Sequence, residues 1–159
     1  MPTPFSDIAL AALEHADIEH RIIDAEQARM LSERNFGDLE DRLPSMLDAL
    51  SRTMLARGAD RLVFELGLDC VLKIPKHGRA VRVNIDEYLR FLDDVHGDLA
   101  QAQLVEIDGV PALVMERVSI VRRSKNLSKR HRKRSRAHQG QLGITATGKV
   151  VAFDYGAAS

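Results

Sequence analysis

The chain has 159 residues, 45% of them hydrophobic and 29% charged, which is the composition of an ordinary one-domain globular protein. Because Cys70 is the one cysteine, an internal disulfide is excluded. The sequence shows neither a signal peptide nor an apolar run long enough to cross a bilayer, which predicts a cytoplasmic protein with no membrane partner. The net charge of zero conceals an asymmetry, because residues 1–121 carry 13 basic and 22 acidic residues, whereas residues 122–138 carry nine basic residues and no acid.

Residues 1–50 are expected to form an N-terminal helical segment. Apolar positions at helical spacing predict a first helix that is capped by Ser6 or Asp7 and continues to a stop at Gly37. A second helix is predicted over residues 39–50, where Pro44 suits the first turn of its main part.

From residue 51 onward the apolar period is that of strands. Strands are predicted at 61–66 and 70–74, with a further candidate at 51–56, and Cys70 at the start of an apolar strand is expected to be a buried, inert thiol. A helix is predicted over 84–92, and an Asp-Gly turn then joins two strands at 104–107 and 110–118. A second hairpin over 142–153 closes the order, which predicts an α+β fold with an antiparallel sheet.

Two motifs carry chemistry. Lys73 lies inside the apolar strand Cys70-Val71-Leu72-Lys73-Ile74-Pro75, where a buried cation needs a partner or a ligand. A strand-like run beginning at Gly148 ends on Asp154-Tyr155-Gly156. With these motifs and this element order, residues 51–156 resemble the protein-kinase-like and aminoglycoside-phosphotransferase-like fold. The form is truncated and degenerate, similar to small phage-type kinase-like proteins.

This resemblance implies N-terminal helices, a kinase small-lobe-like antiparallel sheet with one packed helix, and a C-terminal hairpin, with the large helical lobe absent. We expect a single compact domain overall. Its segments are an N-terminal helical segment at 1–50, a small-lobe-like sheet and helix at 51–120, a basic connection at 121–138 and a catalytic-segment-like hairpin at 139–159.

The resemblance also implies a site for ATP and Mg²⁺, in which a strand lysine holds phosphates. That lysine is Lys73, and its partner from the following helix is Glu87, with Asp86 as the alternative. The glycine-rich loop of the family falls at residues 57–60, where Gly58 is the one glycine and a plain turn is an equal alternative.

The hinge strand of the family, whose backbone groups meet an adenine, corresponds to Glu116 and Val118. A core strand that binds no ligand is the competing interpretation for this segment, because an apolar run of this kind is common in strands.

The catalytic loop departs from the family pattern. Asp154 takes the place of the metal-binding aspartate and His138 is in register, but Arg136 stands where the base belongs and Gln141 replaces the second metal ligand. An arginine cannot accept a proton. We therefore predict a degenerate kinase, with ATP and Mg²⁺ as candidate cofactors, that acts mainly as a binding or regulatory, host-modulating protein. The alternative is a minimal protein kinase that phosphorylates Ser or Thr hydroxyls, including its own, with His138 and Asp154 as catalytic residues.

The basic segment is a competing source of function. It suits electrostatic contact with a nucleic-acid backbone, an acidic surface on a protein partner, or no specific partner at all. No aromatic residue is interleaved, so stacking on bases has no support. Homo-oligomerisation stays open as well. The basic residues in question are Arg122, Arg123, Lys129, Arg130, Arg132, Lys133, Arg134 and Arg136.

Overall fold

The computed structural model describes residues 3–50, 54–120 and 141–153. Within these ranges the helices are α1 (Phe5–His15), α2 (Ala25–Leu31), α3 (Leu39–Ala49) and α4 (Gly78–Leu92). The strands are β1 (Arg21–Ile22), β2 (Met54–Arg57), β3 (Arg61–Leu66), β4 (Cys70–Pro75), β5 (Ala102–Ile107), β6 (Val110–Glu116), β7 (Ser119–Ile120), β8 (Leu142–Ile144) and β9 (Val150–Ala152). The fold is α+β, as the element order predicted.

A six-stranded antiparallel sheet forms the centre of the molecule, in the order β1-β5-β6-β4-β3-β2. The alternation of residues in β3 buries Leu62, Phe64 and Leu66 on one face, as expected for a strand with period two. Strand β4 lies between β3 and β6, and its register places Lys73 opposite Val63 on one side and Leu113 on the other. Lys73 therefore occupies the middle of the sheet rather than an edge.

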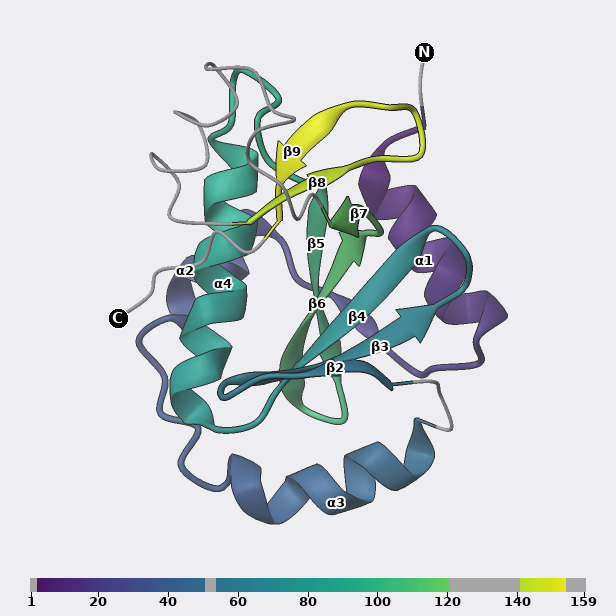
Figure 1. Cartoon of the computed structure of the whole chain (residues 1–159). Coiled ribbons are helices and arrows are strands. Elements are labelled where there is room, and N and C mark those ends of the chain that lie inside the picture. Colours follow the sequence, from purple (N-terminus) through teal and green to yellow (C-terminus); the bar gives the residue numbers. More distant parts are fainter. Residues whose placement is uncertain (1–2, 51–53, 121–140, 154–159) are drawn as a thin grey trace.

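Helix α4 covers one face of this sheet and packs against β4, β5 and β6 (Figure 1). It begins at Gly78, six residues earlier than the sequence pattern predicted, because His77 caps it by accepting a hydrogen bond from the Ala80 amide. The α-carbon of Gly78 lies against the α2–α3 connection, where a Cβ would come within 3.2 Å of the Phe36 carbonyl oxygen. Figure 1 shows α1 on the opposite side of the sheet from α4.

The prediction of one long helix up to Gly37 is wrong. Helix α1 ends at His15, and Asp17 follows in the left-handed region with φ of 58°. The chain then pairs with β5 as strand β1 before helix α2 begins at Ala25, and the N-cap Asp24 forms a capping box with Gln27. Backbone pairing and a strong cap interrupt a segment whose apolar spacing alone was continuous.

Two details of the predicted helix starts are also wrong. The N-cap of α1 is Pro4, which makes no side-chain cap, rather than Ser6 or Asp7. Helix α3 starts at Leu39, so Pro44 lies in its interior and not in its first turn. Pro44 has no N–H, so the carbonyl of Glu40, four residues earlier, receives no helical hydrogen bond from it. Both residues are exposed, so water can reach this carbonyl.

The C-terminal hairpin, β8 and β9, joins β7 in a separate three-stranded sheet. A parallel bridge between Leu99 and Ala152 fixes this hairpin against the α4–β5 connection. In this bridge the Ala100 amide donates to the Ala152 carbonyl at 2.7 Å, and the Ala152 amide donates to the Asp98 carbonyl at 2.8 Å. The end of β9 is thereby held close to the large sheet. Among the described helices, none combines the length and the apolarity needed to cross a bilayer.

Candidate functional site

A buried polar cluster lies where α4 covers β3 and β4. The Glu87 side chain is fully buried, and Arg61 donates two hydrogen bonds to its carboxylate, at 2.6 and 2.9 Å. The Lys73 ammonium lies 3.5 Å from the same carboxylate, and its side chain is only 5% exposed. The structure thus brings together the two residues that the sequence pairs, Lys73 and Glu87, and adds Arg61 to them. Two-pronged contact of this kind is the strongest arrangement available to an arginine and a carboxylate.

Asn84 completes this cluster from the preceding turn of α4. Its amide donates to the carbonyls of Lys73 and Pro111, at 3.3 and 3.2 Å, and its oxygen accepts from Arg61 at 3.1 Å. Asn84 therefore ties α4 to β4 and to β6 through main-chain atoms. Buried polar groups that are all hydrogen-bonded hold one arrangement of helix and sheet.

Arg61 is the member of the cluster that sequence reasoning missed. It stands two residues before Val63, which pairs directly with Lys73, so the two-residue period of β3 places Arg61 on the face that carries Lys73. That spacing was the available signal. Burial raises the pKa of Asp86, the alternative partner, while Arg90 and Arg82 act in the opposite direction. Glu87, and not Asp86, lies against Lys73.

Lys73 also connects the two sheets. Its ammonium donates a 3.0 Å hydrogen bond to the carbonyl of Phe153, the residue that follows β9. The Phe153 amide in turn donates to the Gln141 carbonyl at 3.0 Å, across the base of the hairpin. Lys73 thus contacts the residue immediately before Asp154 in the sequence.

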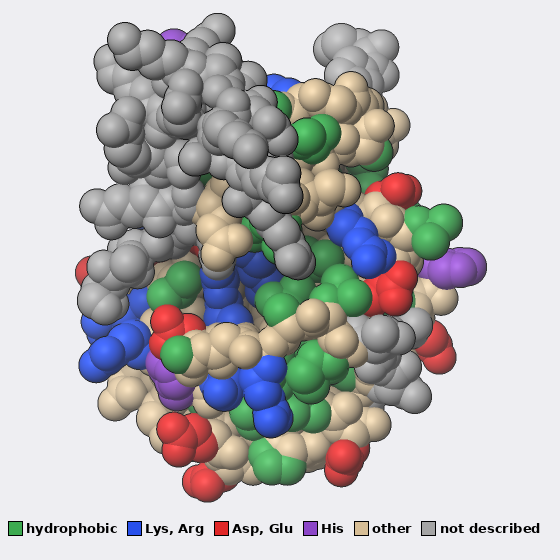
Figure 2. Space-filling model, in the orientation of Figure 1, with side chains coloured by type: hydrophobic (Ala, Val, Ile, Leu, Met, Phe, Trp, Pro, Cys, Tyr) green, Lys and Arg blue, Asp and Glu red, His purple; other side chains and the backbone are tan. Residues whose placement is uncertain are grey.

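A cavity of about 430 Å³ lies beside Lys73, between the large sheet and the small one. Its walls are mostly aliphatic, and Lys73 is the buried cation among them. In Figure 2, hydrophobic and basic side chains lie next to each other in the middle of the face that is shown. The lining residues are Leu55, Ala56, Val63, Val71, Lys73, Met115, Glu116, Arg117, Val118, Ile120, Gln141 and Phe153.

Residues 116–118, which are the last residue of β6 and the two residues before β7, form one wall of this cavity and are held by main-chain contacts. The Glu116 amide donates to the Gln101 carbonyl at 2.9 Å, and the Arg117 amide donates to the Asp69 carbonyl at 2.8 Å. The Val118 amide takes part in no backbone hydrogen bond within the part of the chain that the structure describes. Of the two expected hinge residues, Val118 therefore has the amide that a ligand in the cavity can use, because the Glu116 amide is engaged.

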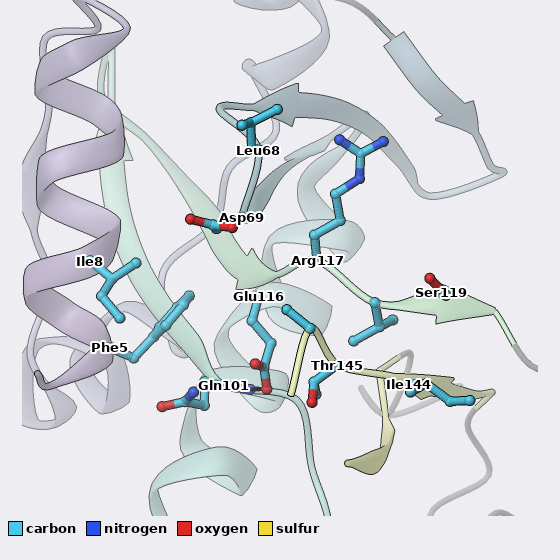
Figure 3. A pocket seen from close by; sticks show the side chains of 12 residues that line it. Phe5, Ile8, Leu68, Asp69, Gln101, Glu116, Arg117, Ser119, Ile144 and Thr145 are labelled. Carbon is cyan, nitrogen blue, oxygen red and sulfur yellow. Dashed lines mark hydrogen bonds between the residues drawn. The ribbon is translucent and has the colours of Figure 1, made fainter. Parts of the chain in front are cut away.

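A second cavity, of about 420 Å³, also borders residues 116–118 (Figure 3). Phe5 and Ile8 line it from α1, together with Gln101 and Glu116, and the main-chain amide of Gln101 donates a 2.9 Å hydrogen bond to the Glu116 carboxylate. Residues 116–118 line both cavities. The two cavities therefore have these three residues in common.

Gly58 lies in the tight turn between β2 and β3. Its amide donates to the Arg61 carbonyl at 2.9 Å, and its own carbonyl accepts from the Lys76 ammonium at 3.0 Å. A Cβ on Gly58 would meet the Arg61 carbonyl at 3.5 Å, which is ordinary contact. Gly58 is not among the described residues that line the cavity beside Lys73, so its geometry is that of a closed turn.

Several candidate residues lie outside the described ranges: His138, Asp154 and the basic residues Arg122, Arg123, Lys129, Arg130, Arg132, Lys133, Arg134 and Arg136. Gln141 is described and lines the cavity beside Lys73. Among described residues, no group of three or more His, Cys, Asp or Glu side chains is arranged to hold a metal ion.

Cys70 is completely buried at the start of β4. Burial, with smaller contributions from the carboxylates of Asp69 and Glu116, raises the pKa of its thiol from 9.0 to about 11. A thiol acts as a nucleophile in its thiolate form, so this environment makes Cys70 inert.

We expect the native protein to become less stable as the pH rises from 9.0 towards 11, because the unfolded thiol ionises in this interval while the folded thiol keeps its proton. Chemical denaturation at several alkaline pH values measures this loss. In Cys70→Ala the loss should be smaller, and an equal loss in both proteins would assign it to other groups. A thiol reagent near pH 8 should react with the native protein about 100-fold more slowly than with the unfolded chain.

Three comparisons with known proteins were made. No protein-family model matches the chain, and no curated protein matches it. Among solved structures, a ternary complex of streptomycin, ATP and APH(2")-IIa matches 62% of this chain and 35% of its own chain, with 18% sequence identity and a TM-score of 0.33. This chain thus spans about a third of the length of that protein.

Proposed function

We propose that this protein is a kinase-like nucleotide binder that holds ATP, with Mg²⁺, in the cavity beside Lys73. The observation that carries the proposal is the position of Lys73, which is buried, lies 3.5 Å from Glu87 and lines a cavity together with residues 116–118. A buried ammonium at the end of an aliphatic cavity suits a ligand that is flat and apolar at one end and anionic at the other.

Each part of the cavity suits one part of the nucleotide. Val63, Val71 and Met115 offer aliphatic walls to an adenine ring, and the Val118 amide offers it a hydrogen-bond donor. Lys73 would bind phosphate oxygens. The cavity volume of about 430 Å³ falls within the usual range for small-molecule sites.

Asp154 and Gln141 are the residues that we propose to hold Mg²⁺. Gln141 lines the cavity, and Asp154 directly follows Phe153, whose carbonyl binds Lys73. Bound Mg²⁺ would neutralise phosphate charge. Both assignments rest on the sequence resemblance, together with the position of Gln141 in the cavity wall.

The protein acts mainly by binding, in this proposal, and regulates a partner protein in its host. The support is chemical, because Arg136 stands where the catalytic base belongs and an arginine cannot accept a proton. The basic segment 122–136 would contact an acidic surface of that partner. Incubation with labelled ATP should therefore transfer no phosphate to protein; transfer that disappears in Asp154→Ala would replace this role by that of a minimal kinase.

We expect Mg·ATP to raise the thermal unfolding midpoint of the protein, and Ala56→Trp to abolish this rise. A ligand at 100 times its dissociation constant stabilises the folded state by about 2.7 kcal/mol. Ala56 is an exposed residue of β2 that lines the cavity, so an indole there fills the space meant for the nucleotide at little cost in packing.

Met54→Trp is the matched control, since Met54 lies on the same strand, is 43% exposed and is not a lining residue of the cavity. This variant should keep the full response to Mg·ATP. A wild-type protein that shows no response at any Mg·ATP concentration would remove the nucleotide proposal, and a response that survives in Ala56→Trp would place the nucleotide elsewhere.

A further inference from the structure

Three arginines surround a small cavity that shares no lining residue with the Lys73 cavity. The cavity has a volume of about 230 Å³ and lies between the α2–α3 connection and the first turns of α4. Its lining residues are Arg34, Asn35, Phe36, Gly78, Arg79 and Arg82. No carboxylate is among them, so positive charge is concentrated around a space that is large enough for a small ligand.

The framework of this cavity is well defined. Phe36 is buried, and the guanidinium carbon of Arg34 lies 5.1 Å from the centre of its ring, a cation–π distance that orients Arg34. Gly78 allows the α2–α3 connection to approach α4, because a Cβ there would lie 3.2 Å from the Phe36 carbonyl oxygen. The two segments are therefore held at a fixed separation.

None of the three arginines lies in an ion pair within the described part of the chain. On α4, Asp86 lies one turn after Arg82. Burial raises the pKa of the Asp86 carboxyl, and Arg82 acts in the opposite direction with a smaller effect. Elsewhere in this protein, Arg21, Arg42, Arg61 and Arg117 each bind a carboxylate. The three arginines around the cavity differ from these four in having no such partner.

We propose that this cavity is a binding site for a phosphate group, either free or carried as a monoester on a side chain. A phosphate dianion offers several strong acceptor oxygens and twofold charge, and arginine is the side chain whose planar fork matches it best. Guanidinium groups from two segments of the chain can donate to one phosphate group in the cavity. This site is separate from the nucleotide cavity, with which it shares no lining residue.

The full-length chain is titrated with inorganic phosphate and with O-phosphoserine at constant ionic strength, and binding is followed by calorimetry. We expect saturable binding that weakens about 10-fold in Arg34→Gln and in Arg82→Gln, because each loses one charge-assisted hydrogen bond of about 1.5 kcal/mol. Both residues are exposed, so the variants should fold normally. Tighter binding of O-phosphoserine than of inorganic phosphate would identify a phosphorylated side chain as the source of the group, and equal binding would identify the free ion.

Arg29→Gln is the matched control, since Arg29 is an exposed arginine of α2 that does not line the cavity. It should bind phosphate as the wild type does. Equal weakening in all three variants would mean nonspecific attraction to positive charge and would overturn the proposal, as would titrations that never saturate. Binding should persist in Lys73→Met and Ala56→Trp, so its loss there would assign the phosphate to the nucleotide cavity instead.

Discussion

Replacement of Glu87 by glutamine should lower the free energy of unfolding by about 3–5 kcal/mol, the usual result when one partner of a buried ion pair is removed. The carboxylate is fully buried and receives two hydrogen bonds from Arg61 while Lys73 lies 3.5 Å away. A neutral amide leaves both cations in a site with little access to water, which is costly. Denaturant unfolding of wild type and Glu87→Gln at neutral pH measures the difference.

Glu106→Gln is the control for this prediction. Glu106 pairs with Arg21, but the two side chains are 29% and 59% exposed, so water already screens the pair. Its loss should cost less than about 1 kcal/mol. If Glu87→Gln were no more destabilising than Glu106→Gln, the buried cluster would not hold α4 against the sheet.

Replacement of Lys73 by methionine should weaken Mg·ATP binding by about 10- to 150-fold, which corresponds to the 1.5–3 kcal/mol of a hydrogen bond to a charged group. The change removes the Lys73 hydrogen bond to the Phe153 carbonyl, but the fold should tolerate this, because Glu87 keeps its two hydrogen bonds to Arg61 and methionine occupies nearly the volume of the lysine stem. Calorimetric titration measures the affinity, and circular dichroism checks that the variant is folded.

Lys76→Met provides the comparison for Lys73→Met. Lys76 lies just after β4, donates to the Gly58 carbonyl and does not line the cavity. Its replacement removes the same charge from the same region of the molecule. Equal losses of affinity in the two variants would show that only the overall charge of this face matters, and the specific role of Lys73 would then be wrong.

Much of the sheet was predictable because its signals are local. The alternation in residues 61–66 and the Asp108-Gly109 turn each specify a strand or hairpin within a few residues, and the structure has these elements. The pairing of Lys73 with Glu87 followed from the resemblance and from the cost of burying a cation. Those predictions needed no knowledge of which distant segments meet.

The break in the expected N-terminal helix and the features that the sequence did not reveal depend on long-range contacts. Strand β1 forms because Arg21 and Ile22 pair with β5, about 80 residues later in the chain, and this pairing interrupts the expected N-terminal helix. Arg61 reaches Glu87 because β3 lies beside β4 under α4, and the two-residue spacing from Val63 becomes informative only when the pairing of β3 with β4 is known. Likewise, the arginine cavity joins residues 34–36 to the start of α4.

A nitrogen–proton correlation spectrum recorded during titration with a non-hydrolysable Mg·ATP analogue tests the central claim most directly. If ATP binds beside Lys73, the amide signals of Val71, Lys73 and Val118, which line the cavity, should shift together and saturate at a common affinity. The signals of α3, which contributes no lining residue, should stay in place. Saturable shifts confined to other parts of the chain, or a spectrum that the nucleotide leaves unchanged, would contradict the assignment of this cavity to ATP.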